Sequence, residues 1–273
     1  MAKPFLKWVG GKTSILPELI KRVPETYGTY WEPFVGGGAL FFALKPAKAV
    51  LSDTNRKLIC AFEAVKNSPE EVMNYLQEIQ EGHDADVYHN AVATYNRTDL
   101  EDTAYGILFI YLNKTCFNGL YRENKSGGFN VPIGKYSTCK VFDREVIAEC
   151  AEALQNADLT CGDFLQRQAK SFVKDDFYYL DPPYYKSYSG YSASLFGEYE
   201  HFKLYRKCKE LDEAGCKFML SNSDEPMIRD LYRDFNIETV EAKRSISCKG
   251  SGRQRKQELI IRNYGNEKEE QKE

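Results

Sequence analysis

Short strand-like runs alternate with helix-like runs at both ends of this chain, and this alternation limits the possible folds more than any other feature. The strand-like runs are rich in β-branched and aromatic residues and lie at 30–34, 49–52, 158–161, 177–180, 217–221, 237–241 and 258–262. The helix-like patterns lie at 12–22, 39–44, 55–66, 69–80, 101–113, 143–156, 198–214 and 225–235. Such alternation predicts an α/β fold, a Rossmann-like, parallel-rich sheet of about seven strands.

The middle of the chain breaks this alternation. Its strand signal is weak, apart from a stretch rich in Gly, Asn and Pro at 118–136 that has the composition of a hairpin. A mainly helical insertion into a discontinuous α/β domain accounts for the pattern. We expect the α/β domain over 1–55 and 156–265, the insertion over 56–155 with a hairpin near 117–136, and a charged, frayed tail over 266–273.

The composition is that of a globular protein. Of the 273 residues, 42% are hydrophobic and 28% are charged, and no apolar run approaches the length of a membrane span. The first residues lack the apolar core of a signal peptide, so we expect a cytoplasmic chain. The eight cysteines include no C-x-x-C pair, which favours reduced thiols over a disulfide frame or a zinc site, and we expect no metal.

The net charge of −3 would by itself argue against a nucleic-acid partner. The distribution of charge argues otherwise. Six basic residues and no acid occupy the Ser/Gly-rich stretch 243–256, between two expected strands. Such a loop can contact phosphates through side chains and backbone amides, although a solvated basic loop is the simpler alternative.

The segment Gly10-Gly11-Lys12-Thr13 ends like a nucleotide-binding P-loop. That motif needs a glycine where this chain has Leu6, and no strand precedes the segment, so we exclude ATP binding here. A Gly-Gly-Lys sequence that opens a helix can still hold an anion or a carboxylate. A plain helix cap is the equally good alternative.

A glycine-rich turn, 36–38, follows the first expected strand and opens a helix. Glycines there allow a tight turn and let a ligand lie against the backbone. Asp53 ends the next strand, where a carboxylate accepts hydrogen bonds from ribose hydroxyls. Phe41 stands where a dinucleotide fingerprint needs Gly or Ala, which disfavours NAD and FAD and leaves another adenosine-bearing cofactor open.

The strand-like run 177–180 delivers Asp181-Pro182-Pro183-Tyr184 to the carboxyl end of the sheet, where open α/β sheets bind ligands. This arrangement suits alkylation of an exocyclic amine, whose nitrogen is a weak nucleophile because its lone pair is delocalised. The Asp181 carboxylate and the Pro182 carbonyl would each accept one N–H and push the nitrogen towards a tetrahedral geometry. Tyr184 would stack on the base. The alternative is a purely structural proline turn with a surface Asp.

Five sequence blocks, which occur in the same order, resemble those of the Dam-type DNA adenine N6-methyltransferases. These enzymes form the alpha group of the D12 class. The catalytic block is Asp181-Pro182-Pro183-Tyr184. The other four are Phe5–Lys12, Glu32–Gly38, Leu112–Pro132 and the carboxyl-terminal segment with Arg244–Ser247, Gly252, Arg253 and Glu258-Leu259. The resemblance covers nearly the whole chain and implies a class I methyltransferase sheet with an inserted target-recognition domain.

The resemblance implies S-adenosylmethionine as the methyl donor and a catalytic role for Asp181, Pro182 and Tyr184. The residues that it implies for cofactor binding are Trp8, Lys12, Phe34, Gly36, Gly38, Asp53, Asp163 and Asp181. Of these, Asp163 matches the acid that reads the adenine of the cofactor. Methyl transfer from a sulfonium is an in-line displacement that needs alignment more than acid–base catalysis.

The resemblance also implies contacts to double-stranded DNA. Phe117 would wedge between base pairs, Asn118 would hold a phosphate, Arg122 would make a bidentate contact to guanine, and Lys7 would read the outer base pair. The remaining expected DNA-binding residues are Leu120, Pro132, Arg244, Ser245, Ser247 and Arg253. The usual target of the family is the adenine of GATC. This chain has Thr115-Cys116-Phe117 where several relatives have Tyr-Gly-Tyr, which bears on the exact target.

We therefore expect a bacterial or phage-encoded enzyme, monomeric and without an obligate protein partner, that methylates N6 of a flipped adenine. One alternative is an RNA-base methyltransferase with the same chemistry, against which the long insertion and Arg122 argue because A-form major grooves are hard to read. The other is a catalytically silent DNA-binding module, against which the intact Asp181 and Tyr184 argue.

Overall fold

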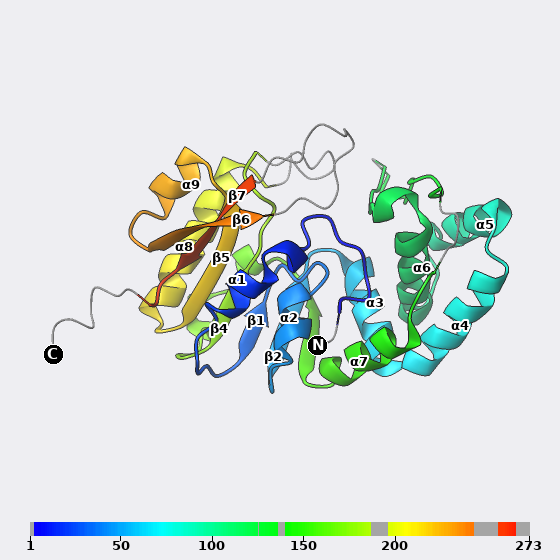
Figure 1. Ribbon diagram of the computed structural model, residues 1–273, viewed down its shortest axis with the longest axis horizontal. Helices are drawn as coiled ribbons and strands as arrows, with labels where there is room; N and C mark the ends of the chain where they lie inside the picture. Colours follow the sequence, from blue (N-terminus) through cyan, green and yellow to red (C-terminus); the bar gives the residue numbers. More distant parts are fainter. Residues whose placement is uncertain (1–2, 125, 136–139, 187–195, 243–255, 266–273) are drawn as a thin grey trace. The chain divides into compact units, whose positions relative to one another are not determined.

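The computed structural model describes residues 3–124, 126–135, 140–186, 196–242 and 256–265 (Figure 1). By its contacts the chain forms two compact units. The first comprises Met1–Gly11, Val35–Pro46 and Leu51–Gly162, and the second comprises Lys12–Phe34, Ala47–Val50 and Asp163–Glu273. Residues 243–255 of the expected basic loop 243–256, with Arg244, Ser245, Ser247 and Arg253, lie outside the described residues, as does the expected tail at 266–273.

The described residues form a seven-stranded mixed sheet in the order β3-β2-β1-β4-β5-β7-β6, which confirms the expected α/β class. The strands are β1 (Tyr30–Glu32), β2 (Ala49–Asp53), β3 (Ala157–Cys161), β4 (Phe177–Leu180), β5 (Lys217–Ser223), β6 (Asn236–Ala242) and β7 (Lys256–Arg262). Strand β4 pairs in parallel with β1 and with β5, whereas β7 is antiparallel to β5 and β6. The chain therefore reverses its direction of strand addition between β1 and β4, as in a Rossmann-like sheet.

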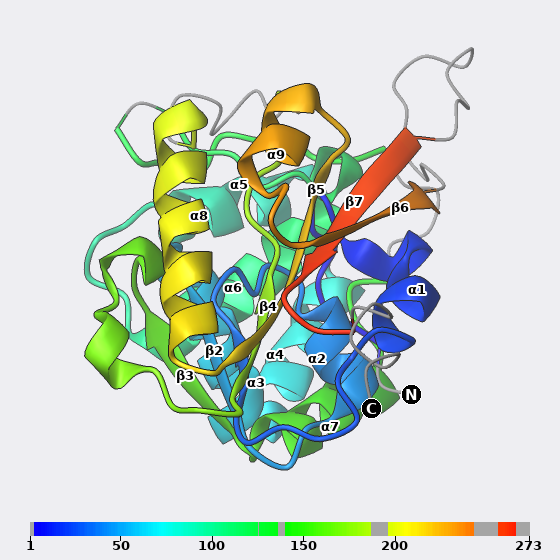
Figure 2. The same ribbon diagram turned by 90° about the vertical axis from the view of Figure 1, so that its left-hand side faces the viewer.

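Helix α8 (Glu198–Glu213) packs against the sheet strands of the second unit (Figure 2). Its buried stripe, Leu204, Cys208 and Leu211, joins side chains of β5 such as Phe218 and Leu220 in one apolar cluster. The spacing of that stripe, four and then three residues, is the spacing that brings side chains to one face of a helix. This packing holds β5 and its polar carboxyl end in place. The other helical elements of this unit are η1 (Lys12–Ser14), α1 (Leu16–Ile20), η3 (Phe164–Gln166), η4 (Ala169–Ser171) and α9 (Pro226–Leu231).

The first unit is mainly helical, with α3 packed against α4, α6 and α7. Its helical elements are α2 (Ala39–Leu44), α3 (Arg56–Asn67), α4 (Pro69–Glu81), α5 (Ala85–Tyr95), α6 (Asp102–Thr115), η2 (Phe117–Gly119) and α7 (Arg144–Leu154). Helix α6 is buried along most of its length, which matches its nearly unbroken apolar sequence. At Gly106 a side chain would have its Cβ 2.4 Å from the carbonyl oxygen of Cys60, so the close approach of α3 and α6 requires glycine.

Two expectations about helices are wrong, and one helix was not expected. The helix expected over 12–22 is broken into η1 and α1, because α1 starts anew with Pro17 in its first turn. The helix expected over 225–235 is shorter, Pro226–Leu231. Helix α5 was not expected at all, although Asp84 caps it by accepting a hydrogen bond from the backbone N–H of Val87 at 2.8 Å.

In the described part of the segment 117–136, the expected hairpin shows two isolated antiparallel bridges, Cys116 with Ile133 and Glu123 with Phe129. The side chain of Asn96, at the end of α5, both accepts from and donates to the backbone of Phe129, at 2.8 and 3.0 Å. The segment is therefore held by the residue that ends helix α5 as well as by its own pairing. Among the described residues, no helix combines the length and the apolar character that a bilayer crossing requires.

Candidate active site

The candidate catalytic loop, residues 181–185, begins where the buried strand β4 ends. Strand β4 is apolar and fully buried, and β1 beside it ends at Glu32. The carboxyl ends of these two strands meet at the point where the strand order reverses, which is where open α/β sheets bind ligands. Asp181 is thus delivered to the expected edge of the sheet.

Two groups hold the carboxylate of Asp181. Lys12 Nζ lies 2.8 Å from Oδ2, and the hydroxyl of Ser221 donates to Oδ1 at 2.6 Å. The side chains of Lys12 and Asp181 are 8% and 18% exposed, so the pair is largely shielded from water. Because a carboxylate offers about four lone-pair sites, each oxygen keeps capacity for a further hydrogen bond. Sequence reasoning placed Lys12 and Asp181 among the cofactor contacts but missed Ser221.

Tyr184 is held at both its ring and its hydroxyl. Its hydroxyl donates to Oε2 of Glu258 in β7 at 2.8 Å, and Lys12 Nζ lies 4.6 Å from the ring centroid. Burial, with the nearby Asp181 and Glu258 carboxylates, raises the pKa of Tyr184 well above its ordinary value, so the hydroxyl remains a donor. Pro182 is buried, which fits a rigid turn. The role of Glu258 as an anchor for Tyr184 was not expected from the sequence.

In the first unit, the glycine-rich turn lies beside Trp8 and Asp53. Gly36 has φ +46° and Gly38 has φ +67°, conformations that other residues rarely adopt. A Cβ on Gly36 would lie 2.6 Å from the Trp8 ring, so the turn and the indole require this glycine. Asp53 accepts hydrogen bonds from the backbone N–H of Gly36 at 3.3 Å and of Asn55 at 2.9 Å.

Burial raises the pKa of the Asp53 carboxyl, and the backbone N–H groups of Asn55 and Gly36 partly offset this effect. A half-buried carboxylate of this kind gains from further donors such as hydroxyl groups. Trp8, Gly36, Gly38 and Asp53 are therefore brought together, as a nucleoside-binding site would require.

Phe34 and Asp163 belong to the second unit. The Phe34 ring lies edge-on to Phe164 and to Phe196, with centroids 6.2 and 6.0 Å apart. Asp163 is exposed and accepts the backbone N–H of Leu165 at 2.9 Å, which caps the short helix η3. Its position fits a capping role as well as the expected contact to a cofactor.

Of the described residues that were expected to contact DNA, all except Lys7 lie on the segment 117–132 of the first unit. Phe117 is 46% exposed, and Asn118 adopts the left-handed conformation with φ +57°. Arg122 donates through Nε to Oδ1 of Asn130 at 2.6 Å and through Nη2 to its backbone oxygen at 2.9 Å. Leu120 is half-buried and Pro132 is exposed.

Lys7 lies next to this segment. Its backbone donates to Oδ1 of Asn113 at 2.8 Å, and its Nζ donates to the backbone oxygen of Lys114 at 3.4 Å. Burial, with the charge of Lys7 as the second cause, lowers the pKa of Lys114 to about 8. Asn113 also donates from Nδ2 to the backbone oxygen of Lys7 at 2.7 Å, so it fixes the amino-terminal motif to α6. Asn113 was not expected to act in this way.

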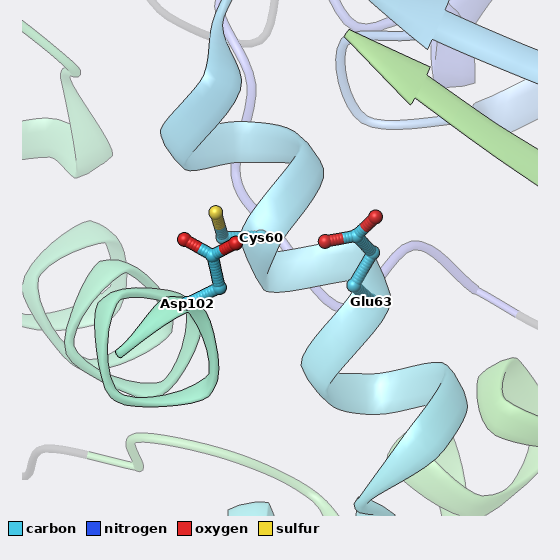
Figure 3. A group of neighbouring side chains, drawn as sticks. All are labelled: Cys60, Glu63 and Asp102. Carbon is cyan, nitrogen blue, oxygen red and sulfur yellow. The ribbon is translucent and has the colours of Figure 1, made fainter. Parts of the chain in front are cut away.

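A separate cluster, Cys60, Glu63 and Asp102, has the side-chain composition of a metal site (Figure 3). Its chemistry does not suit a cation. Arg56 Nη2 already binds both oxygens of Asp102, at 2.7 and 2.9 Å. Burial raises the pKa of the Cys60 thiol to about 11, so the sulfur stays protonated. We therefore assign no metal to this cluster.

Comparison with known proteins identifies the class. The model of the D12 class N6 adenine-specific DNA methyltransferases matches residues 8–246, and the chain belongs to this family. It is 37% identical to the type II methyltransferase M1.LlaDCHI of Lactococcus lactis subsp. cremoris, over 97% of this chain and 96% of that protein. It is also 37% identical to the type II methyltransferase M.MjaIII of Methanocaldococcus jannaschii, over 96% of this chain and 99% of that protein. The DNA adenine methylase of Vibrio cholerae is 32% identical, over 94% and 95%.

Proposed function

We propose that this protein transfers the methyl group of S-adenosylmethionine to N6 of an adenine flipped out of duplex DNA, within the sequence GATC. The observation that carries the proposal is the Asp181 carboxylate, fixed by Lys12 and Ser221 at the carboxyl end of β4. Membership in the adenine-specific family supports the reaction, and the name DNA adenine methylase of the relative in Vibrio cholerae supports the target base.

The turn at Gly36 and Gly38 fits an adenosine-bearing cofactor. Gly36 leaves room for nothing larger than hydrogen beside Trp8, and the half-buried Asp53 keeps acceptor capacity for ribose hydroxyls. Trp8, Lys12, Phe34 and Asp163 would complete the contacts. When bound, S-adenosylmethionine supplies a methyl group activated on a sulfonium.

The catalytic loop would prepare the acceptor nitrogen. Asp181 and the backbone carbonyl of Pro182 each accept one hydrogen of the adenine amine, which draws the nitrogen towards a tetrahedral geometry and frees its lone pair. Tyr184, held through its hydroxyl by Glu258, stacks on the base. Lys12 Nζ, 2.8 Å from Oδ2, orients the Asp181 carboxylate, so that it acts as an acceptor.

The helical insertion would recognise the target. Phe117 would enter the base stack, Asn118 would bind a phosphate and Arg122 would exchange its partner Asn130 for a guanine edge. Lys7 would read the outer base pair, and Leu120 and Pro132 would line the same surface. The segment at 243–256 would add phosphate contacts. We propose that the protein acts as a monomer.

Transfer of labelled methyl groups tests this function. The unmodified chain should label duplex DNA that contains GATC, should label single-base variants of that site at least about tenfold more slowly, and should leave ribosomal RNA unlabelled. Labelling of RNA in preference to DNA would favour the RNA-base methyltransferase. The absence of calorimetric binding of S-adenosylmethionine, with DNA binding retained, would favour the silent DNA-binding module.

A further inference from the structure

Three consecutive buried polar residues end the central strand β5. Ser221, Asn222 and Ser223 are 0%, 0% and 1% exposed, directly after the apolar run 218–220. Burying polar side chains is unfavourable unless they form hydrogen bonds, so their partners indicate what they do. We call these three residues the β5 clamp.

The β5 clamp holds the catalytic loop at both of its ends. The hydroxyl of Ser221 donates to Oδ1 of Asp181 at 2.6 Å. Oδ1 of Asn222 accepts the backbone N–H of Tyr185 at 3.2 Å, and the hydroxyl of Ser223 donates to the backbone oxygen of Tyr185 at 2.8 Å. Both neighbours of the segment Pro182–Tyr184 are thereby fixed to one strand.

A fourth residue, Tyr179 in β4, supports Ser221 by a hydrogen bond whose direction Asp181 determines. Its hydroxyl lies 3.3 Å from the Ser221 hydroxyl. The Asp181 carboxylate can only accept, so the single hydroxyl proton of Ser221 points to Asp181 and Tyr179 donates to Ser221. Burial, with the negative charge of Asp181 as the second cause, raises the pKa of Tyr179 well above its ordinary value and keeps it a donor.

The β5 clamp is not explained by stability alone. Nδ2 of Asn222 is buried and has no hydrogen-bond partner in the described part of the chain. A buried donor without an acceptor destabilises a fold, and an apolar residue there would avoid this loss. The other end of the same amide, Oδ1, accepts the backbone N–H of Ser223 at 2.8 Å and its hydroxyl at 3.3 Å, as well as the backbone N–H of Tyr185 at 3.2 Å. The amide therefore joins Ser223 and the catalytic loop through one oxygen and leaves its own N–H donors unsatisfied, which a role in holding the loop explains.

We propose that Ser221, Asn222 and Ser223 are positioning residues that preorganise the catalytic loop, with Tyr179 as their support. The inference rests on the proposed function and adds residues to it that the catalytic motif does not contain. Ser221 orients the acceptor oxygen of Asp181, and Asn222 and Ser223 fix the backbone that presents Tyr184. None of the three contacts the reacting atoms in this account.

Hydroxyl deletions test the proposal in the full chain, with steady-state methyl transfer to duplex DNA as the readout. Ser221→Ala should lower kcat about 10- to 100-fold, while the KM values for DNA and S-adenosylmethionine and the melting temperature change little. Ser221→Thr, which restores a hydroxyl, should recover most of the lost rate. A residue with only a structural role would not show this split between kcat and KM.

Two adjacent tyrosines of β4 supply a matched pair of variants. Tyr179→Phe removes the hydroxyl that supports Ser221, whereas Tyr178→Phe removes an equally buried hydroxyl from the opposite face of the strand. The first should lower kcat about 3- to 10-fold, and the second should leave it unchanged. If Ser221→Ala does not fold, this pair decides the matter.

The proposal is wrong if folded Ser221→Ala keeps kcat within about twofold of the unmodified chain, or if the two tyrosine variants have equal kcat. It also fails, together with the proposed function, if the unmodified chain transfers no methyl group to DNA. Normal transfer by the unmodified chain with unaffected variants would refute the β5 clamp alone.

Discussion

The catalytic loop 181–185 and the segment 117–132 are built in opposite ways. In the loop, Asp181 is bound by Lys12 and Ser221, and Tyr184 is anchored on Glu258. In the segment, Phe117 is 46% exposed and Arg122 pairs with Asn130 at the surface. The difference separates two tasks. Groups proposed to act on the amine are fixed before substrate arrives, whereas groups proposed to read DNA hold partners that a base or a phosphate can replace.

The largest effect on methyl transfer should come from a substitution in the catalytic loop. Asp181→Ala should lower methyl transfer by about 10³-fold or more, because it removes the acceptor on which the geometry of the amine depends. The affinity for duplex DNA should stay nearly constant in a fluorescence titration. Asp230→Ala, which removes an exposed acid of α9, is the matched control and should be active. Even modest turnover of Asp181→Ala would refute the role given to this carboxylate.

Low pH should destabilise the fold where it supports the catalytic loop. The His201 ring is buried and packs edge-on against Tyr185 and Phe196, with centroids 5.7 and 4.9 Å away. Burial lowers the pKa of His201 from 6.5 to about 4, and the nearby Glu200 opposes this shift. Between pH 6.5 and 4 the unfolded chain therefore binds more protons than the folded chain, so stability falls as pH falls through this window.

The shift corresponds to a loss of about 3 kcal/mol in the free energy of unfolding between neutral pH and pH 4. Urea unfolding of the unmodified chain and of His201→Leu, each followed from pH 7.5 to about 4, measures it. The difference in free energy between the two proteins should change with pH by that amount. Parallel pH profiles would show that His201 does not titrate as expected.

Substitutions in the segment 117–132 should change the selectivity for the DNA sequence. Arg122→Ala should reduce discrimination at one base pair of the site by about 1–3 kcal/mol, with a smaller loss of non-specific binding. Competition between the target duplex and its single-base variants measures this directly. Unchanged selectivity would remove Arg122 from the proposed interface.

The smallest effect should be electrostatic. Lys7→Ala removes the charge that, after burial, contributes most to the lowered pKa of Lys114, so this pKa should rise slightly from about 8. NMR titration of the Lys114 side chain would detect the change. A pKa that stays constant would mean that the two ammonium groups do not lie as close as the structure places them.

Much of the sheet was predictable, because runs such as 177–180 are apolar, short and bounded by turn residues. Helix α5 was not, since Val87, Val92 and Thr94 weaken its helical signal and Asn96 anchors it to Phe129, 33 positions away in sequence. Local patterns carry no information on such a contact.

The candidate site likewise combines a local sequence motif, which was predictable, with contacts between residues far apart in the sequence, which were not. The motif at Asp181 was visible because its residues are contiguous. Its supports were not, since Ser221 lies 40 positions from Asp181 and Glu258 lies 74 positions from Tyr184. The polar sequence Ser221-Asn222-Ser223 after an apolar strand was the available signal, and only the pairing of β5 with β4 gives it a meaning.

The central claim is methylation of adenine at N6 in a defined DNA sequence. Single-molecule sequencing of unmethylated genomic DNA, exposed to the purified protein and S-adenosylmethionine, tests it most directly. We predict N6-methyladenine at GATC and at no other short sequence, and none in DNA exposed to Asp181→Ala. Absence of N6-methyladenine, or methylation on cytosine instead, would contradict the account.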